Sequence, residues 1–142
     1  MKIKPNIFGK KIGKGKTRTV YFHKENPNWV IKKILSKENP TPEANQNEWN
    51  LWLAVKDTPF VNLFCPCVEL TPEGHLIMLR CEPVEKNFKE ISKILDVELP
   101  KDSANPINYG LLNKRSVLID YGHPDFLPLI DALNQYKRYL NA

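Results

Sequence analysis

The chain has 142 residues and a mass of 16.5 kDa, which suffices for one domain with a hydrophobic core. Hydrophobic residues make up 42% of the sequence and charged residues 26%, which argues against a largely disordered chain. The 21 Lys and Arg residues outnumber the 16 Asp and Glu residues, and much of this excess of positive charge lies before residue 40. We therefore expect either an anionic partner or a solvated basic face.

The first third of the chain is predicted to form strands. Residues 6–35 alternate short apolar runs with turn residues, which is typical of three antiparallel strands joined by tight turns. The runs cover 7–8, 19–22 and 29–35, and they are separated by the segment around Gly13 and Gly15 and by residues 25–28. Residues 36–42 have the composition of a loop.

A helix and a hairpin are predicted next. Residues 43–55 contain no Gly or Pro, and Trp49, Trp52 and Leu53 have helical spacing, so this segment is expected to be a helix with an apolar stripe in the core. Residues 67–70 and 75–79 favour strands, and the turn residues 71–74 between them predict a hairpin.

The last third is predicted to be helix, hairpin and helix. Apolar spacing predicts an amphipathic helix over 84–95, and residues 99–108 are polar and irregular. Residues 109–112 and 117–119 indicate a second hairpin around 113–115. A final helix is expected over 125–140, with Asp125 near its N-terminal end and Pro128 in its first turn. We therefore predict one α+β domain over residues 1–142.

Membrane and metal signals are weak. No run of 18 apolar residues and no apolar signal-peptide core occur, so we expect a cytoplasmic protein without a membrane span. The three cysteines, Cys65, Cys67 and Cys81, lack the paired spacing of zinc sites and are expected to be free thiols.

Two charged residues have a spacing that suggests a site in the N-terminal half. Burial of a lysine in the apolar strand around residue 32 is costly unless the lysine is paired, so Lys32 should point toward an anion. Glu48 on the predicted helix is its expected partner. The alternative is a solvated edge lysine and an ordinary surface glutamate.

A second group of polar residues flanks the last hairpin. Asn108 stands just before one strand, and Asp120 starts an Asp-Tyr-Gly sequence just after the other. An amide and a carboxylate oxygen are ligands that Mg²⁺ accepts together with phosphate oxygens and water. Alternatively, Asn108 caps a turn and Asp120 ends a strand.

In this order, these residues together resemble the protein-kinase-like superfamily, and most closely the small kinase-like proteins of bacteriophages and bacteria. The resemblance covers about residues 8–124. It implies a five-stranded antiparallel N-lobe sheet with one αC-like helix over about 6–80, and a reduced, mostly helical C-lobe over about 84–142. It also implies ATP and Mg²⁺ as cofactors, and the host cytoplasm as the location if the gene is viral.

The resemblance also assigns roles to individual residues. Gly13, Gly15 and Val20 match the nucleotide-covering loop, although Arg18 stands where its third glycine would be. Lys32 would hold the phosphates and be oriented by Glu48, Met78 and Arg80 would lie at the gatekeeper and hinge, and Asn108 and Asp120 would carry Mg²⁺. A strand after the glycines, in place of a helix, argues against a Rossmann turn or a P-loop.

The chain also departs from the family. It has no His-Arg-Asp sequence: Ser103 stands at the catalytic aspartate's position, and Asp102, one residue earlier, is the candidate for that role. We expect the 20 residues after Gly122 to hold neither a full activation segment nor the helices that dock a protein substrate.

Two functions therefore stay open. The chain could be an ATP-dependent kinase that phosphorylates protein Ser/Thr, or an inactive pseudokinase that binds or inhibits a host or partner protein. Nucleic-acid binding through the basic N-terminal third is a weaker third reading, because no reader motif accompanies the charge.

Overall fold

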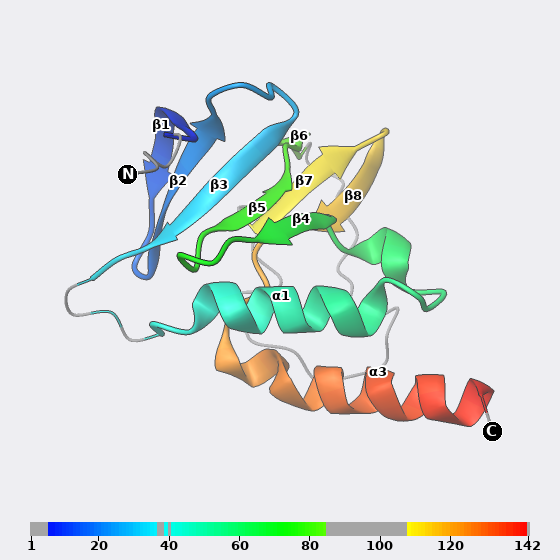
Figure 1. The fold of residues 1–142 in the computed structure, drawn as a ribbon. Coiled ribbons are helices and arrows are strands. Elements are labelled where there is room, and N and C mark those ends of the chain that lie inside the picture. Colours follow the sequence, from blue (N-terminus) through cyan, green and yellow to red (C-terminus); the bar gives the residue numbers. More distant parts are fainter. Residues whose placement is uncertain (1–5, 37–38, 40, 85–107, 142) are drawn as a thin grey trace.

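The computed structural model describes residues 6–36, 39, 41–84 and 108–141. Within these ranges the chain has an α+β fold with a five-stranded sheet, a three-stranded sheet and two α-helices (Figure 1). The candidate catalytic residue Asp102 and nearly all of the helix predicted over 84–95 lie outside the described residues.

The larger sheet is antiparallel throughout and has the order β1-β2-β3-β5-β4. Its strands are β1 (Phe8–Lys14), β2 (Arg18–His23), β3 (Trp29–Ile34), β4 (Cys67–Leu70) and β5 (Leu76–Leu79). The predicted three strands and hairpin are thus confirmed. One boundary differs: Gly13 lies inside β1 opposite Val20, and the turn is tightened later, where the Gly15 amide donates a hydrogen bond to the Arg18 carbonyl (2.8 Å).

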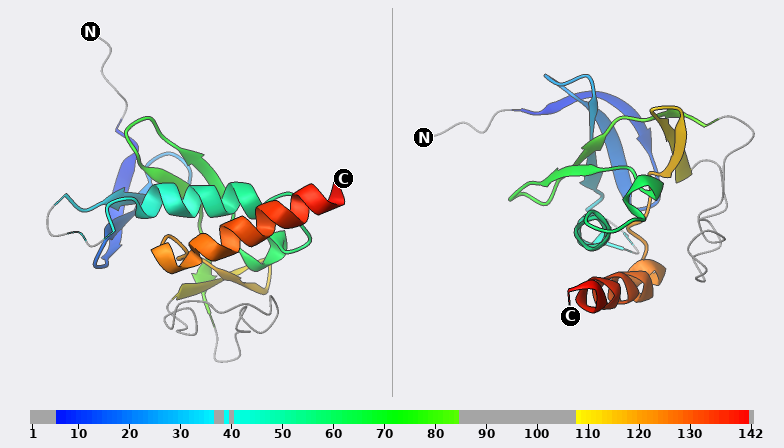
Figure 2. Two further views of the ribbon diagram at one scale, coloured as in Figure 1. Left: turned by 90° about the horizontal axis from the view of Figure 1, so that it is seen from below. Right: turned by 90° about the vertical axis from the view of Figure 1, so that its right-hand side faces the viewer.

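The two helices form successive layers on one side of this sheet. Helix α1 (Ala44–Val55) contacts β3, β4 and β5, and α3 (Leu127–Leu140) packs against α1, as the right-hand view of Figure 2 shows. Because α1 lies between the sheet and α3, it buries polar as well as apolar side chains. The predicted apolar stripe is correspondingly imperfect, since Trp49 and Trp52 are partly buried but Leu53 is exposed.

The smaller sheet contains β6 (Glu82–Pro83), β7 (Tyr109–Leu112) and β8 (Arg115–Leu118). The β7–β8 hairpin was predicted, and its turn consists of Asn113 and Lys114, which both have positive φ, as in the tight turns that suit twisted strands. Strand β6 was not predicted, because two residues that include a proline carry no strand pattern. Glycine is required at position 110, since a Cβ there would collide with the Cβ of Cys81.

Two short 3-10 turns lead into neighbouring elements. Turn η1 (Val61–Leu63) precedes β4, and the Cys65 amide after it donates to the Leu118 carbonyl (2.9 Å), which ties this segment to β8. Turn η4 (Pro124–Phe126) precedes α3, so the final helix starts later than predicted, at Leu127, with Pro128 in its first turn. The Asp125 amide is capped by the His123 side chain.

The core is continuous across the described elements. Its fully buried side chains come from α1, the segment before β4, β5, β8 and the segment after β8, and they include Leu51, Phe64, Leu76, Leu118 and Tyr121. Leu129 and Leu133 of α3 complete it. Among the described residues, no helix is long and apolar enough to cross a membrane.

Candidate functional site

The strand register places three of the predicted site residues side by side. Gly13 of β1 lies opposite Val20 of β2, and Val20 lies opposite Lys32 of β3. Opposed residues of neighbouring strands project to the same face of a sheet, and so do residues two apart on one strand. Arg18 therefore shares a face with Val20 and Lys32, and this face carries the candidate site.

The predicted pair between Lys32 and Glu48 is present. The Lys32 ammonium lies 2.8 Å from a carboxylate oxygen of Glu48 on α1 and also donates to the backbone carbonyl of Ile119. The Lys32 side chain is only 8% exposed, which rules out the solvated edge lysine.

Arg18 joins this pair to Asp120. Its Nη1 donates to Glu48 (2.6 Å) and to the Asn45 side-chain oxygen (3.2 Å), and its Nη2 donates to Asp120 Oδ1 (2.6 Å). Sequence reasoning treated Arg18 as a missing glycine and did not predict this role. The available signal was the same one that identified Lys32, a cation in an apolar strand.

We call Arg18, Lys32, Glu48 and Asp120 the ion cluster; it contains two cations and two anions. Burial alone would raise the pKa of Glu48, but Arg18 and Lys32 hold it below its ordinary value. Burial likewise opposes the charge on Arg18, but Glu48 and Asp120 raise its pKa. Both groups stay charged at neutral pH. The cluster opens to solvent at Asp120, whose side chain is 54% exposed.

Helix α1 also fixes the backbone that follows β8. The Tyr121 amide donates to Glu48 Oε1 (2.6 Å), and the Asn47 side chain donates to the Gly122 carbonyl (3.1 Å). Gly122 leaves no space for a side chain, because a Cβ would collide with the Ala44 carbonyl. The tyrosine ring is fully buried and its hydroxyl donates to the Cys65 carbonyl (2.7 Å).

The remaining predicted site residues that the structure describes lie outside the ion cluster. Met78 is 1% exposed and belongs to the core, and the Arg80 guanidinium lies 4.8 Å from the centre of the Phe22 ring. The Asn108 carbonyl accepts a hydrogen bond from the Ile119 amide (2.8 Å), which brings Asn108 close to Asp120 in the backbone. Gly13 and Gly15 lie at the end of the β1–β2 hairpin, next to Arg18.

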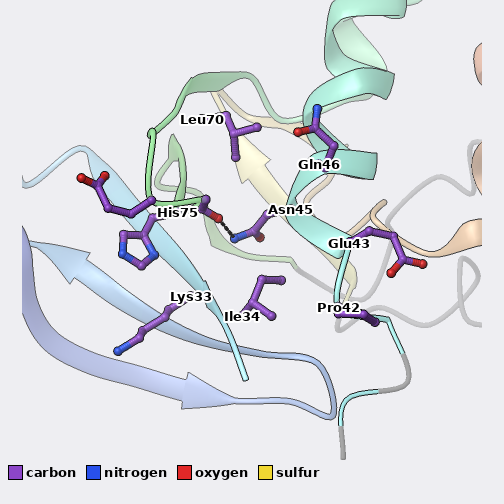
Figure 3. Close-up of a pocket in the computed structure, with 10 residues that line it drawn as sticks. Lys33, Ile34, Pro42, Glu43, Asn45, Gln46, Leu70 and His75 are labelled. Carbon is purple, nitrogen blue, oxygen red and sulfur yellow. Dashed lines mark hydrogen bonds between the residues drawn. The ribbon is translucent and has the colours of Figure 1, made fainter. Parts of the chain in front are cut away.

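A separate cavity of about 310 Å³ lies beside the cluster (Figure 3). It is lined by the end of β3, the start of α1 and the β4–β5 turn, with Glu43, Gln46 and His75 among its walls. Asn45 links it to the cluster, since its amide nitrogen donates to the Lys32 and Gly74 carbonyls (2.7 and 2.8 Å) while its oxygen accepts from Arg18. No sequence pattern predicted this cavity.

Metal ligands are sparse in the part of the chain that the structure describes. There, no group of three or more His, Cys, Asp and Glu side chains is arranged to hold a metal ion.

The sequence matches neither a known protein-family model nor a curated protein. The ion cluster and the elements that build it are therefore the features that bear on function.

Proposed function

We propose that the chain is a minimal kinase-like protein that binds ATP beside the ion cluster. The observation that carries this proposal is the convergence of Lys32, Glu48 and Asp120, which come from β3, α1 and the segment after β8. A buried lysine held by a helix glutamate next to an acidic residue is the arrangement with which kinase folds position phosphates.

The β1–β2 hairpin adds to the support. Its tip carries Lys14 at the end of β1 and Gly15 and Lys16 in the turn, all exposed, and β2 begins at Arg18. Exposed lysines around a glycine attract an anion, and the small residue lets the ligand approach the backbone. An ATP triphosphate would thus meet positive charge at the turn, next to a cluster in which the two cations balance the two anions.

We further propose that the protein acts as a pseudokinase, a binding module for a partner protein, which would be a host protein if the gene is viral. The Arg18–Asp120 ion pair favours this role, because the carboxylate that a kinase uses for catalytic metal is already occupied by a fixed cation.

Phosphate transfer to a protein Ser/Thr is the second candidate. The formed Lys32–Glu48 pair favours it, because active kinase folds require this pair. In that case Asp102, which lies outside the described residues, would orient the acceptor hydroxyl.

Thermal unfolding in an ATP titration tests nucleotide binding. ATP at about 100 times its Kd should stabilise the wild type by about 2.7 kcal/mol, since only the folded state binds. Lys33→Ala is the matched control, because Lys33 is the next residue of β3 and is exposed. We expect Lys33→Ala to keep the ATP-dependent shift and Lys32→Ala to lose it; equal shifts in both variants would refute the proposed site.

Transfer of a labelled γ-phosphate separates the two roles. A pseudokinase labels neither itself nor lysate proteins, and Asp102→Ala then behaves like the wild type. Labelling that Asp102→Ala abolishes would establish the phosphotransferase instead.

A further inference from the structure

We propose that Arg18 takes the place of a divalent cation at Asp120, so that this site binds its nucleotide without metal. The nucleotide part of this inference rests on the proposed function. The exclusion of metal by Arg18 does not, and it can be tested alone.

Mg²⁺ fits Asp120 poorly. Mg²⁺ needs hard oxygen ligands in a regular octahedron, and Asp120 Oδ1 already accepts from Arg18 at 2.6 Å. A metal ion on this carboxylate would lie only a few ångströms from the guanidinium, and like charges at that separation repel strongly near a protein surface. Asp120, paired with Arg18 in this way, therefore does not fit the expected metal.

Arg18 is held firmly in its place beside Asp120. Its Nη2 donates to Asp120 and also to Glu48 Oε1, and its Nη1 donates to Glu48 Oε2 and to Asn45. Arg18 is 6% exposed, and Glu48 is fully buried. Departure of Arg18 would leave a buried carboxylate with a single cation, and breaking a buried ion pair in this way is costly.

Arg18 also changes what a nucleotide would meet at Asp120. In a kinase-like site the metal screens the acidic residue from the phosphates. Here Arg18 already neutralises Asp120, and Lys14 and Lys16 are exposed on the adjoining turn. A triphosphate therefore needs no metal to approach Asp120, so Arg18 determines the metal requirement of the site.

Mn²⁺ alone tests the exclusion of metal, with free Mn²⁺ followed by its electron paramagnetic resonance signal. We expect the wild type and Asp120→Asn to bind Mn²⁺ equally weakly. Arg18→Gln, which keeps hydrogen-bond donors but removes the charge, should bind Mn²⁺ at least about tenfold more tightly, because the repulsion is gone. Adding Asp120→Asn to Arg18→Gln should reverse this gain.

Two results of this titration would overturn the proposal. One is tighter Mn²⁺ binding by the wild type than by Asp120→Asn. The other is an Arg18→Gln variant that is folded, as judged by circular dichroism, and has unchanged Mn²⁺ affinity. The wild-type comparison needs no Arg18 variant, so a misfolded Arg18→Gln does not remove the test.

A second experiment tests nucleotide binding. It compares the ATP-dependent rise in unfolding temperature in EDTA with that in Mg²⁺. We expect equal shifts for the wild type, and a larger shift with Mg²⁺ for Arg18→Gln. A wild-type shift that appears only with Mg²⁺ contradicts metal-independent binding. The absence of any shift under both conditions refutes the proposed nucleotide binding, and the Mn²⁺ titration then decides on Arg18 by itself.

Discussion

Glu48 is the residue on which the ion cluster depends. Its carboxylate is completely buried, and it accepts hydrogen bonds from Arg18, from Lys32 and from the Tyr121 amide. It thus connects β2, β3 and the segment after β8 to α1. Without its charge, Arg18 would keep the partly exposed Asp120 as a partner, and Lys32 would lose the carboxylate with which it is paired.

Glu48→Gln should therefore destabilise the protein by about 3 kcal/mol or more, since it leaves buried charge without compensation. The free energy of unfolding in urea at pH 7 measures this. Glu25→Gln is the control, because Glu25 is exposed in the β2–β3 connection, and its effect should stay within about 0.5 kcal/mol. A loss below about 1 kcal/mol for Glu48→Gln would show that the cluster contributes little to stability.

The same carboxylate predicts the acid sensitivity of the fold. Because Arg18 and Lys32 lower the pKa of Glu48 in the folded state, its contribution is present above the ordinary glutamate pKa of about 4.3. The contribution is lost as the pH falls from there through the folded-state pKa. Urea unfolding between pH 7 and pH 2 should thus show a steeper loss for the wild type than for Glu48→Gln. Parallel curves would contradict this.

Gly122 is required for a different reason, which is the lack of space beside α1. A Cβ at this position would meet the Ala44 backbone, which has no flexible end to move aside. Gly122→Ala should cost about 1–3 kcal/mol through overpacking, measured by thermal or urea unfolding. Gly13→Ala is the matched control, since a Cβ there meets nothing within 4 Å, and it should be close to neutral. Equal effects at both positions would contradict the packing argument.

Local sequence patterns predicted most of the strands and helices that the structure describes. Alternating apolar residues identified β2, β3, β4 and β5, and helical spacing identified α1 and α3. Strand β6 was missed because it exists only through its pairing with β7. The start of α3 was misplaced because His123, outside the helical pattern, caps the preceding turn.

In the candidate site too, the sequence predicted one contact and missed another that depends on long-range packing. The Lys32–Glu48 pair could be predicted, because a cation in an apolar strand needs a partner and the next helix supplied one. The Arg18–Asp120 pair joins residues 102 positions apart, and no local pattern encodes such a contact. The family resemblance suggested a missing glycine at Arg18, so its pairing became evident only from the register of β2 and the position of α1.

Helix α3 covers the face of α1 that points away from the sheet (Figure 2). Truncation of one buried side chain of α3 therefore measures how much this packing stabilises the protein. Leu133→Ala should cost about 2–5 kcal/mol, because Leu133 is 3% exposed in the core and its removal leaves a cavity. Leu140→Ala, in the last turn of the same helix and 55% exposed, is the control and should be near neutral. Similar losses for the two variants in urea unfolding would show that α3 packs differently.

The three cysteines lie where the two sheets meet. Cys65 follows η1 and is fully buried, Cys67 begins β4, and Cys81 stands between β5 and β6. The sulfur atoms of Cys65 and Cys81 are 3.2 Å apart and form no disulfide, so both are free thiols, as predicted. Reagents that modify thiols therefore report on whether the two sheets stay together.

Alkylation by iodoacetamide should distinguish the three thiols in the native protein. Hydrogen bonding with Cys65 lowers the pKa of Cys81, whereas burial raises the pKa of Cys67 to about 12. The pKa of Cys65 is raised by its hydrogen bond with Cys81 and by burial. Since the thiolate is the reactive form and Cys81 is partly exposed, Cys81 should be modified first. Peptide mass spectrometry of samples taken over time measures each site.

Cys65 and Cys67 should react only when the molecule opens, so their rates should rise together as urea is added. In Cys81→Ser the early modification should disappear while the two slow sites keep their protection in the absence of urea. Fast modification of Cys65 in the native protein would show that the segment after η1 separates from β8 without global unfolding. The hydrogen bond from the Cys65 amide to Leu118 and the bond from Tyr121 to the Cys65 carbonyl both oppose such an opening.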